Sequence, residues 1–451
     1  MNLYSKYNLS QLKSNELNVT AEMQEKINLW ADMIAGTAPW NLKYKPSGVI
    51  NAISGALTNP VDEEIKVTAF SDKLNDVMTI LDSNSNQIVS DMVLSGGCVC
   101  RPVYSNSRIQ FELIRLGNYI PTHYDLDGTL TGAMLLKSFI DGKKDFLLVE
   151  NHSYKNKTHS VNLELFRTDG GKMEKVNLSS CSQTAGLTES WQWENVDKPF
   201  IIEFRNRRQN NIDGSQFPVA IYSGYENLIE DADRQYNNIN WEQIAGRTKT
   251  FIDEDLLPKK KLEGTSKTYT VVPQDMKDVF VMLEGNGVDA AKIQEHSPQL
   301  RTAQQIEAFN EILRRIELAC NIGKGTLSNL ESSVQTATQY TGGKKALYTA
   351  VDTIESELEL KYHHCAYVFA YMLSAYEGIK FDDAIEITFN DSARKDPMQM
   401  KAEAIQELQN NILNPWEFRM KFYGEDEATA KANCPTVDNG SLTVGGFSLF
   451  E

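Results

Sequence analysis

The spacing of apolar residues along this chain of 451 residues changes from a helical period to a strand-like period and back. Two helices are predicted near the N-terminus, from stripes at Ala21, Ile27, Trp30, Ala31 and Ile34 and at Leu74, Val77, Ile80 and Leu81. Gly36 and Pro39 should end the first of them, because glycine and proline commonly follow a helix C-terminus. The N-terminal part is therefore predicted to begin with helices.

From about Val93 to Glu203 the pattern is that of strands. Apolar runs such as 108–114, 145–150 and 161–166 alternate with turns rich in Asn, Gly and Asp. Strands separated by such short turns pair in an antiparallel manner. The sequence therefore predicts an α+β fold in which the sheet is mainly antiparallel.

Helical spacing returns in two segments, from Tyr225 to Ile239 and from Leu300 to Cys320. A strand-like insert from about Lys249 to Glu295 separates them, so it is predicted to project between two helices. The polar stretch from Gly325 to Gly343 is rich in Ser, Thr and Gln and predicts an exposed loop.

The longest helical pattern runs from about residue 343 to 376, which corresponds to roughly 50 Å of helix at about 1.5 Å per residue. A lone strand at Ile385–Phe389 should return to an earlier sheet, and further helices are predicted from Pro397 onward. Within the segment 414–427, Asn414, Glu417 and Gly424 suit the N-cap, the capping carboxylate and the C-terminus of a short helix.

Composition limits the classes of function. The chain has 45 basic and 61 acidic residues, a net charge of −16, which argues against a protein that grips nucleic acid tightly. It does not exclude a surface along which DNA slides. The six cysteines lack the spacing of a metal site, so free thiols in a reducing cytoplasm are expected. No secretory signal or membrane-spanning run is recognised, so we expect synthesis in the cytosol.

The most enzyme-like string is Asp125-Leu126-Asp127-Gly128-Thr129, which matches the nucleophile motif of haloacid-dehalogenase-like phosphatases. In that chemistry the first aspartate attacks phosphorus and the second acts as acid and base beside a magnesium ion. The motif needs a buried parallel strand before it. Pro121 should interrupt such a strand, so a β-turn at Asp127-Gly128 is the favoured interpretation.

Other candidate sites carry less weight. Gly342-Gly343-Lys344-Lys345 could favour an anion at a helix start. His363-His364-Cys365 cannot converge on one metal ion, because adjacent helical positions point about 100° apart. Lys259-Lys260-Lys261 is as compatible with contact to nucleic acid as with a solvated turn. Arg205, Arg207 and Arg208 could pair with acidic groups across a subunit interface.

A series of short motifs, in order over about 400 residues, resembles the portal proteins of bacteriophages, in the branch common in tailed phages and prophages of Gram-positive bacteria. The motifs are 29–40 (with Trp30, Pro39 and Trp40), Gly96-Gly97 with Arg101-Pro102, Glu150-Asn151-His152, Asp213-Gly214-Ser215, Ser297-Pro298-Gln299-Leu300-Arg301, Thr336-Ala337-Thr338, Asn390-Asp391-Ser392 and 414–427. Each is weak alone, and their order and spacing carry the resemblance.

The resemblance implies a portal-like fold with named parts. These are a wing at 1–222, stem helix 1 at 223–248, a clip at 249–296, stem helix 2 at 297–323, a tunnel loop at 324–342, the long helix and return strand of the wing at 343–395, and a crown with C-terminal tail at 396–451. This order agrees with the order of helices and strands predicted above.

The resemblance also implies a function without catalysis. A ring, typically of twelve copies, would sit at one capsid vertex of the virion after assembly in the bacterial cytoplasm. It would pass double-stranded DNA and dock the terminase large subunit and later a head-tail adaptor, beside the major capsid and scaffold proteins. No catalytic residue, cofactor, metal or membrane partner is expected. DNA would meet the tunnel loop at Leu327, Ser328, Asn329, Ser332 and Gln335, and the clip would present Lys259, Lys260 and Lys261 for docking.

Two alternatives remain open at this point. One is a magnesium-dependent phosphatase that uses Asp125 and Asp127. The other is a ring-forming scaffold protein of a virion or secretion machine that has no path for DNA.

Overall fold

A computed structural model describes residues 3–7, 19–169, 172–247, 249–253, 259–261, 263, 266, 268–271, 280–283, 293–328, 337–389, 397–410 and 412–434. The chain divides into two units, Met1–Thr388 and Phe389–Glu451. Helices and mainly antiparallel sheets are both present, so the α+β prediction is confirmed at that level.

The first unit begins with short helices. They are α1 (Leu3–Lys6), α2 (Ala21–Ala35), η2 (Pro39–Leu42), α3 (Val49–Glu64), α4 (Asp72–Asp82) and α5 (Ser85–Ser95). Helix α2 starts where the Thr20 hydroxyl accepts the Met23 N–H and ends at Gly36, whose φ is 70°. Helix α4 agrees with the predicted stripe except at Ile80, which is exposed.

Two antiparallel sheets follow. The smaller contains β2 (Gly97–Ser105), β3 (Arg108–Arg115) and β10 (Ile202–Arg205), in the order β10-β2-β3. The larger contains β4 (Tyr119–Tyr124), β5 (Leu130–Asp141), β6 (Lys144–Lys155), β7 (Thr158–Asp169) and β8 (Lys172–Val176) in chain order, and β9 (Ser190–Glu194) also pairs with β7. A core cluster on β6 and β7, which includes Phe146 and Leu165, packs against Leu178 in the short helix η3 (Leu178–Ser180).

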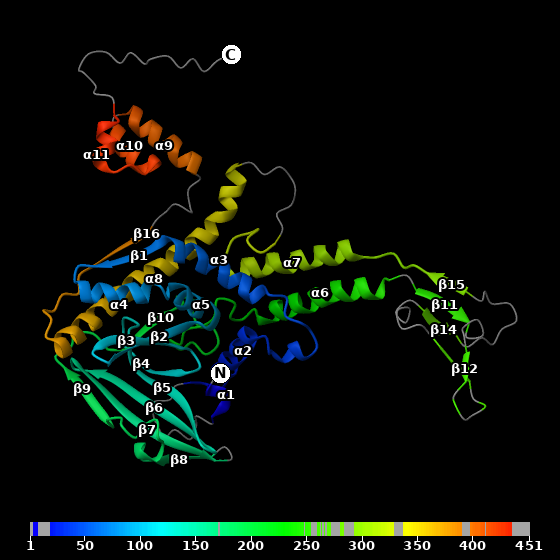
Figure 1. Ribbon diagram of the computed structural model, residues 1–451, viewed down its shortest axis with the longest axis horizontal. Helices are drawn as coiled ribbons and strands as arrows, with labels where there is room; N and C mark the ends of the chain where they lie inside the picture. Colours follow the sequence, from blue (N-terminus) through cyan, green and yellow to red (C-terminus); the bar gives the residue numbers. More distant parts are fainter. Residues whose placement is uncertain are drawn as a thin grey trace. The chain divides into compact units, whose positions relative to one another are not determined.

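Helices α6 (Glu226–Ala245) and α7 (Thr302–Cys320) lie side by side and are hereafter called the hairpin (Figure 1). The Gln235 side-chain amide donates to the Gln305 carbonyl at 3.0 Å, and the rings of Tyr236 and Phe309 lie 6.5 Å apart. The strands between the two helices are β11 (Lys249–Asp253), β12 (Lys259–Lys261), β13 (Thr268–Thr270), β14 (Phe280–Leu283) and β15 (Ile293–His296). They pair as a sheet β14-β11-β15 and a ribbon β12-β13.

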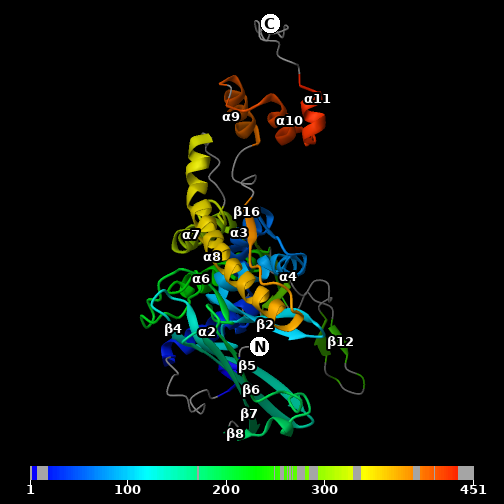
Figure 2. The same cartoon turned by 90° about the vertical axis from the view of Figure 1, so that its left-hand side faces the viewer.

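Helix α8 (Ala337–Glu377) is the longest helix described and lies against α3, α4 and the sheet β10-β2-β3 (Figures 1 and 2). Its buried stripe includes Val351, Leu358 and Phe369, which lie within the range where a long helix was predicted. The helix begins at Ala337 rather than at residue 343, so the predicted start is wrong. Gly342 and Gly343 remain inside it, because a glycine costs only about 1 kcal/mol in a helix interior and does not have to end one.

Within the described residues, the late strand β16 (Ile385–Phe389) pairs with β1 (Ile65–Ala69) alone. The strand does return to an earlier part of the chain, as predicted, but it does not join one of the larger sheets. Its partner is a strand between two N-terminal helices, and the pair forms a separate two-stranded sheet.

The second unit contains α9 (Pro397–Gln409), α10 (Pro415–Tyr423) and α11 (Glu427–Ala432). The capping box predicted at Asn414 and Glu417 is present, and Gly424 ends α10 at φ 66°. Across the described parts of both units, none of the helices combines the length and the apolar character that crossing a bilayer requires.

His364 fixes α8 to the segment before β10. Its Nε2 lies 2.8 Å from the Pro199 carbonyl, to which it donates when this nitrogen carries the proton. Burial lowers the pKa of His364 to about 3, although the hydrogen bond to Pro199 acts in the opposite direction. In the unfolded chain the pKa of His364 is about 6.5, so between pH 3 and 6.5 the imidazole takes up a proton when the protein unfolds. The stabilising contribution is therefore complete above pH 6.5 and declines as the pH falls toward 3.

We predict that His364→Gln, which keeps a hydrogen-bond donor but does not titrate there, flattens the decline in unfolding free energy between pH 6 and 4. The expected difference in slope is about 1.4 kcal/mol per pH unit. Urea unfolding at one fixed protein concentration measures it. His363→Gln is the control, because His363 is exposed on the same helix. Equal slopes for wild type and His364→Gln would contradict the prediction.

Candidate functional site: the base of the helical hairpin

The base of the hairpin is held by carboxylates that point into the protein rather than into solvent. Asp233 on α6 is buried and accepts four hydrogen bonds from the segment that precedes α3. The backbone N–H and hydroxyl of Ser47 both donate to its Oδ1 at 2.7 Å. Trp40 Nε1 donates to its Oδ2 at 2.9 Å and Asn41 Nδ2 at 3.1 Å. One carboxylate therefore fixes η2 and the loop after it to the hairpin.

Glu226, at the first turn of α6, makes a second connection of this kind. Trp30 Nε1 on α2 donates to its Oε1 at 2.9 Å, and Lys26 lies 3.0 Å from its Oε2. Burial raises the pKa of Glu226, but the hydrogen bond from Trp30 and the Lys26 ammonium group outweigh it and leave the pKa below its usual value. The carboxylate is thus ionised where it meets the indole.

Arg208 joins the end of α7 to the residues that lead into α6. Its Nη1 donates to the carbonyl oxygens of Ile221 and Ala319, the latter at 3.1 Å, and its guanidinium lies 5.6 Å from the centre of the Tyr225 ring. Arg207 pairs with Glu357 on α8 at 2.8 Å, and Arg205 donates to the Gln216 carbonyl at 2.9 Å. All three arginines thus have partners in their own chain, and pairing with acidic groups across a subunit interface stays a prediction.

The outer faces of the hairpin carry large apolar side chains. Trp241 on α6 is 66% exposed and Leu318 on α7 is 83% exposed. Other exposed apolar residues on or next to these helices are Ile244, Leu300 and Ile306. Large exposed apolar side chains on a helix pair favour a contact with another protein.

The predicted tunnel-loop residues are only partly within the described residues. Leu327 is half-buried, and Ser328 is 6% exposed. The expectation of an exposed loop is wrong at Ser328, because its hydroxyl and N–H both donate to Glu317. Asn329, Ser332 and Gln335 lie outside the described residues.

Lys259, Lys260 and Lys261 form the exposed strand β12, opposite Thr270, Tyr269 and Thr268 of β13. Lys260 therefore shares a face of the ribbon with Tyr269, which is also exposed. The use of these lysines for docking stays a prediction.

Asp125 and Asp127 lie in the tight turn between β4 and β5, so the β-turn interpretation is confirmed. The Gly128 N–H donates to the Asp125 carbonyl at 3.0 Å, and Gly128 has a φ of 82°. The two strands are antiparallel, which is not the setting that the phosphatase motif needs. Pro121 does not interrupt β4, contrary to expectation. β4 is an edge strand, and its register with β5 shifts just after Pro121.

No group of His, Cys, Asp and Glu suited to a metal ion occurs within the described parts of the chain. His363, His364 and Cys365 diverge: the first is exposed, the second bonds to Pro199 and the third is buried beside Cys100. Burial raises the pKa of Cys98, and the hydrogen bond with Cys365 together with burial raises the pKa of Cys100, so these thiols are poor nucleophiles.

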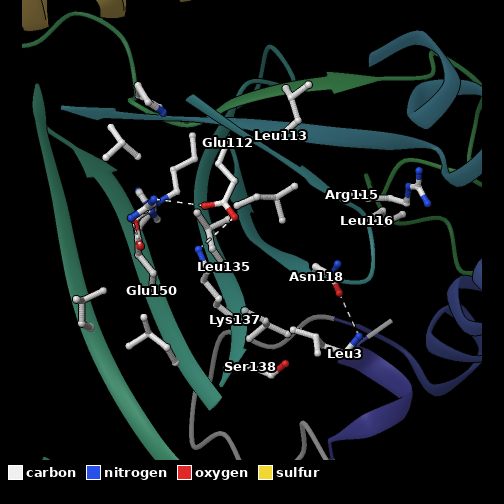
Figure 3. A pocket seen from close by; sticks show the side chains of 18 of the residues that line it. Leu3, Glu112, Leu113, Arg115, Leu116, Asn118, Leu135, Lys137, Ser138 and Glu150 are labelled. Carbon is white, nitrogen blue, oxygen red and sulfur yellow. Dashed lines mark hydrogen bonds and ion pairs between the residues drawn. The ribbon is translucent and has the colours of Figure 1, made fainter. Parts of the chain in front are cut away.

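A cavity of about 1340 Å³ opens between β3 and the strands β5 and β6 (Figure 3). Apart from the exposed Asp32, its charged groups are paired within the chain. Arg101 donates two hydrogen bonds to Glu150, at 2.7 and 2.6 Å, and Lys137 lies 3.4 Å from Glu112. Arg115 and Asp91 form a further pair at 2.5 Å. The pairing favours a structural role, because little charge is left for a ligand.

The Glu150-Asn151-His152 motif is the centre of this buried network. The Phe200 N–H donates to His159 Nδ1 at 3.2 Å, so His159 Nε2 carries the proton that bonds to His152 Nδ1 at 2.9 Å. His152 Nε2–H then donates to Glu150 at 2.8 Å. Burial alone would raise the pKa of Glu150, but His152 and Arg101 lower it to about 2.

Neither a protein-family model nor a curated protein sequence matches this chain.

Glu226, Asp233 and Glu317 were not predicted as site residues from the sequence. A signal for them exists in hindsight. Glu226 and Asp233 stand at helical spacing with the buried Ile229, and Glu317 stands next to the buried Ile316. An acidic residue on the apolar side of a helix indicates a buried carboxylate that needs donors from elsewhere.

We predict that Asp233→Asn lowers the free energy of unfolding by about 1–3 kcal/mol, because an amide leaves half-buried donors from Ser47, Trp40 or Asn41 without an acceptor. Asp231→Asn is the control, since Asp231 lies on the same helix in an exposed pair with Arg234, and it should change stability by less than about 0.5 kcal/mol. Chemical denaturation compares the variants, and equal effects would contradict the role given to Asp233.

Proposed function

We propose that this chain is a bacteriophage portal protein, a ring-forming channel for double-stranded DNA at one vertex of a capsid. Its main support is the hairpin. Two antiparallel helices flank a strand-rich insert, are held at one end by buried carboxylates, and expose apolar side chains such as Trp241 and Leu318. In the portal interpretation these helices are the stem, the insert is the clip, and α8 is the long helix of the wing.

The exposed apolar groups favour self-assembly over a monomer. Trp241 and Ile244 lie on the part of α6 toward the insert. Ile306 lies on the part of α7 toward it, and Leu300 lies just before α7 begins. A cyclic ring needs one surface of each protomer to fit a different surface of the next. The faces of the stem helices and the contacts between wings would together form this interface. Obligate interfaces of this kind bury large apolar areas.

The net charge of −16 suits a channel that conducts DNA without holding it. A negative lumen repels phosphates, whereas a tight binder concentrates Lys and Arg to displace counterions. The clip with Lys259, Lys260 and Lys261 would meet the terminase large subunit and later a head-tail adaptor. The wing would contact the major capsid and scaffold proteins, in a virion assembled in the bacterial cytoplasm.

The alternatives differ in what supports them. Another ring-forming virion protein would use the same exposed surfaces. Only a portal protein needs a channel wide enough for duplex DNA, so the width of the channel distinguishes the two. The phosphatase finds no support in the turn at Asp125 and Asp127, because that chemistry requires a parallel strand before the motif.

Cryo-electron microscopy of the purified protein, averaged along the particle axis, tests the proposal. We expect rings of about twelve subunits around an open channel roughly 20 Å or more wide, since duplex DNA must fit inside. Closed rings without a channel would support the scaffold alternative. A chain that stays monomeric at all concentrations and in the presence of capsid and scaffold proteins would contradict both.

We further predict that Trp241→Glu prevents ring formation while the monomer keeps its thermal stability, because Trp241 makes little contact within its own chain. Asn240→Glu adds the same charge at the preceding residue of α6, which is also exposed, and should leave the rings intact. Size-exclusion chromatography with light scattering distinguishes them. Rings of Trp241→Glu at wild-type yield would show that this face is not an interface.

A further inference from the structure

Glu317 occupies an unusual position at the last turn of α7. Its side chain carries a carboxylate, yet the residue is only 1% exposed. Three backbone N–H groups donate to it, from Gly325 at 2.9 Å and from Leu327 and Ser328 at 2.6 Å each. The Ser328 hydroxyl donates at 3.0 Å. All four donors come from the short segment that follows the helix.

The segment and the carboxylate depend on each other. A buried carboxylate costs several kcal/mol unless donors replace its water, and bonds from N–H groups to an ionised oxygen are about twice as strong as neutral ones. The chain can return to Glu317 because Asn321, Gly323 and Gly325 all adopt positive φ, at 55°, 83° and 84°. Without the carboxylate, three N–H groups of this bend would lose their acceptor.

The bend is also fixed relative to the rest of the hairpin. Arg208 donates to the Ala319 carbonyl, two residues after Glu317, and to the Ile221 carbonyl before α6. The Thr326 hydroxyl donates to the Ile322 carbonyl at 2.7 Å and closes the bend internally. The position of Ser328 is therefore set by Glu317 on α7 and by Arg208, which joins the end of α7 to the residues before α6.

We propose that Glu317 is the positioning residue for the polar segment that follows α7. By holding the backbone of Gly325, Leu327 and Ser328, it fixes the place from which the chain continues after Ser328. This inference rests on the proposed portal function. It assigns Ser328 to the support of that segment rather than to contact with DNA, and it gives Glu317 a role in DNA passage without contact to DNA.

The test compares full-length Glu317→Gln with Glu311→Gln. Glutamine has the same size but replaces one acceptor oxygen with a donor, so it cannot accept all four bonds. Glu311 lies on the same helix, is exposed and pairs with Arg314 and Arg315. Two readouts are needed: the rate of tryptic cleavage after Lys324, which is exposed in the bend, and the fraction of DNA-filled particles when each variant is the only source of the chain.

For Glu317→Gln we expect cleavage after Lys324 about tenfold faster than in wild type, the change that loss of one charge-assisted hydrogen bond produces. Rings should form at wild-type yield, and DNA-filled particles should fall by about tenfold. Glu311→Gln should match wild type in every readout. Ser328→Ala, which removes only the hydroxyl donor, should change cleavage and filling in the same direction by about threefold.

Unchanged cleavage in Glu317→Gln, or in Ser328→Ala if the first variant does not fold, would overturn the positioning role. Faster cleavage with normal DNA filling would also overturn it, because Glu317 would then be structural only. If wild-type chain forms no rings, the portal function fails instead, and the cleavage comparison still reports on the contact between Glu317 and the bend.

Discussion

The burial of three carboxylates on the helical hairpin, those of Glu226, Asp233 and Glu317, is the constraint on which the first unit depends. Each would cost several kcal/mol if it were buried without donors. The donors come from α2, from the segment around Ser47 and from the bend after α7. Helices α6 and α7 can therefore reach their final position only when these distant segments are also in place, which makes the hairpin and the N-terminal helices fold as one cooperative structure.

The same constraint divides the hairpin into two parts with different properties. Its base is tied by Trp30, Trp40 and Arg208 to the surrounding helices. The part toward the strand-rich insert lacks such buried carboxylates and instead exposes Trp241 and Ile244. A helix pair that is fixed at one end and exposes apolar side chains such as Trp241 and Leu318 along its length suits assembly side by side with copies of itself. This is the physical basis of the proposed ring, in which DNA would move past rigid stems.

Periodicity predicted the elements that depend on local sequence. The stripes from Tyr225 and from Leu300, the capping box at Asn414 and the turn at Asp127-Gly128 all have local causes, and the structure contains them. It could not predict contacts between residues far apart in the chain. Asp233 meets Trp40 across 193 positions, and β16 pairs with a strand more than 300 positions earlier. Ser328 was predicted to lie in an exposed loop because polar residues are usually exposed. Its burial depends on an acceptor outside that loop, Glu317, which the sequence pattern does not reveal.

Hydrogen–deuterium exchange of the unassembled full-length chain tests most directly whether buried carboxylates fix the base of the hairpin. Backbone amides of α6 near Asp233 and of α7 near Glu317 should exchange at least about tenfold more slowly than those near Ile244 and Ile306, because opening the base also breaks the bonds to Trp40 and to the bend. Equal exchange along both helices, or faster exchange at the base, would contradict the account.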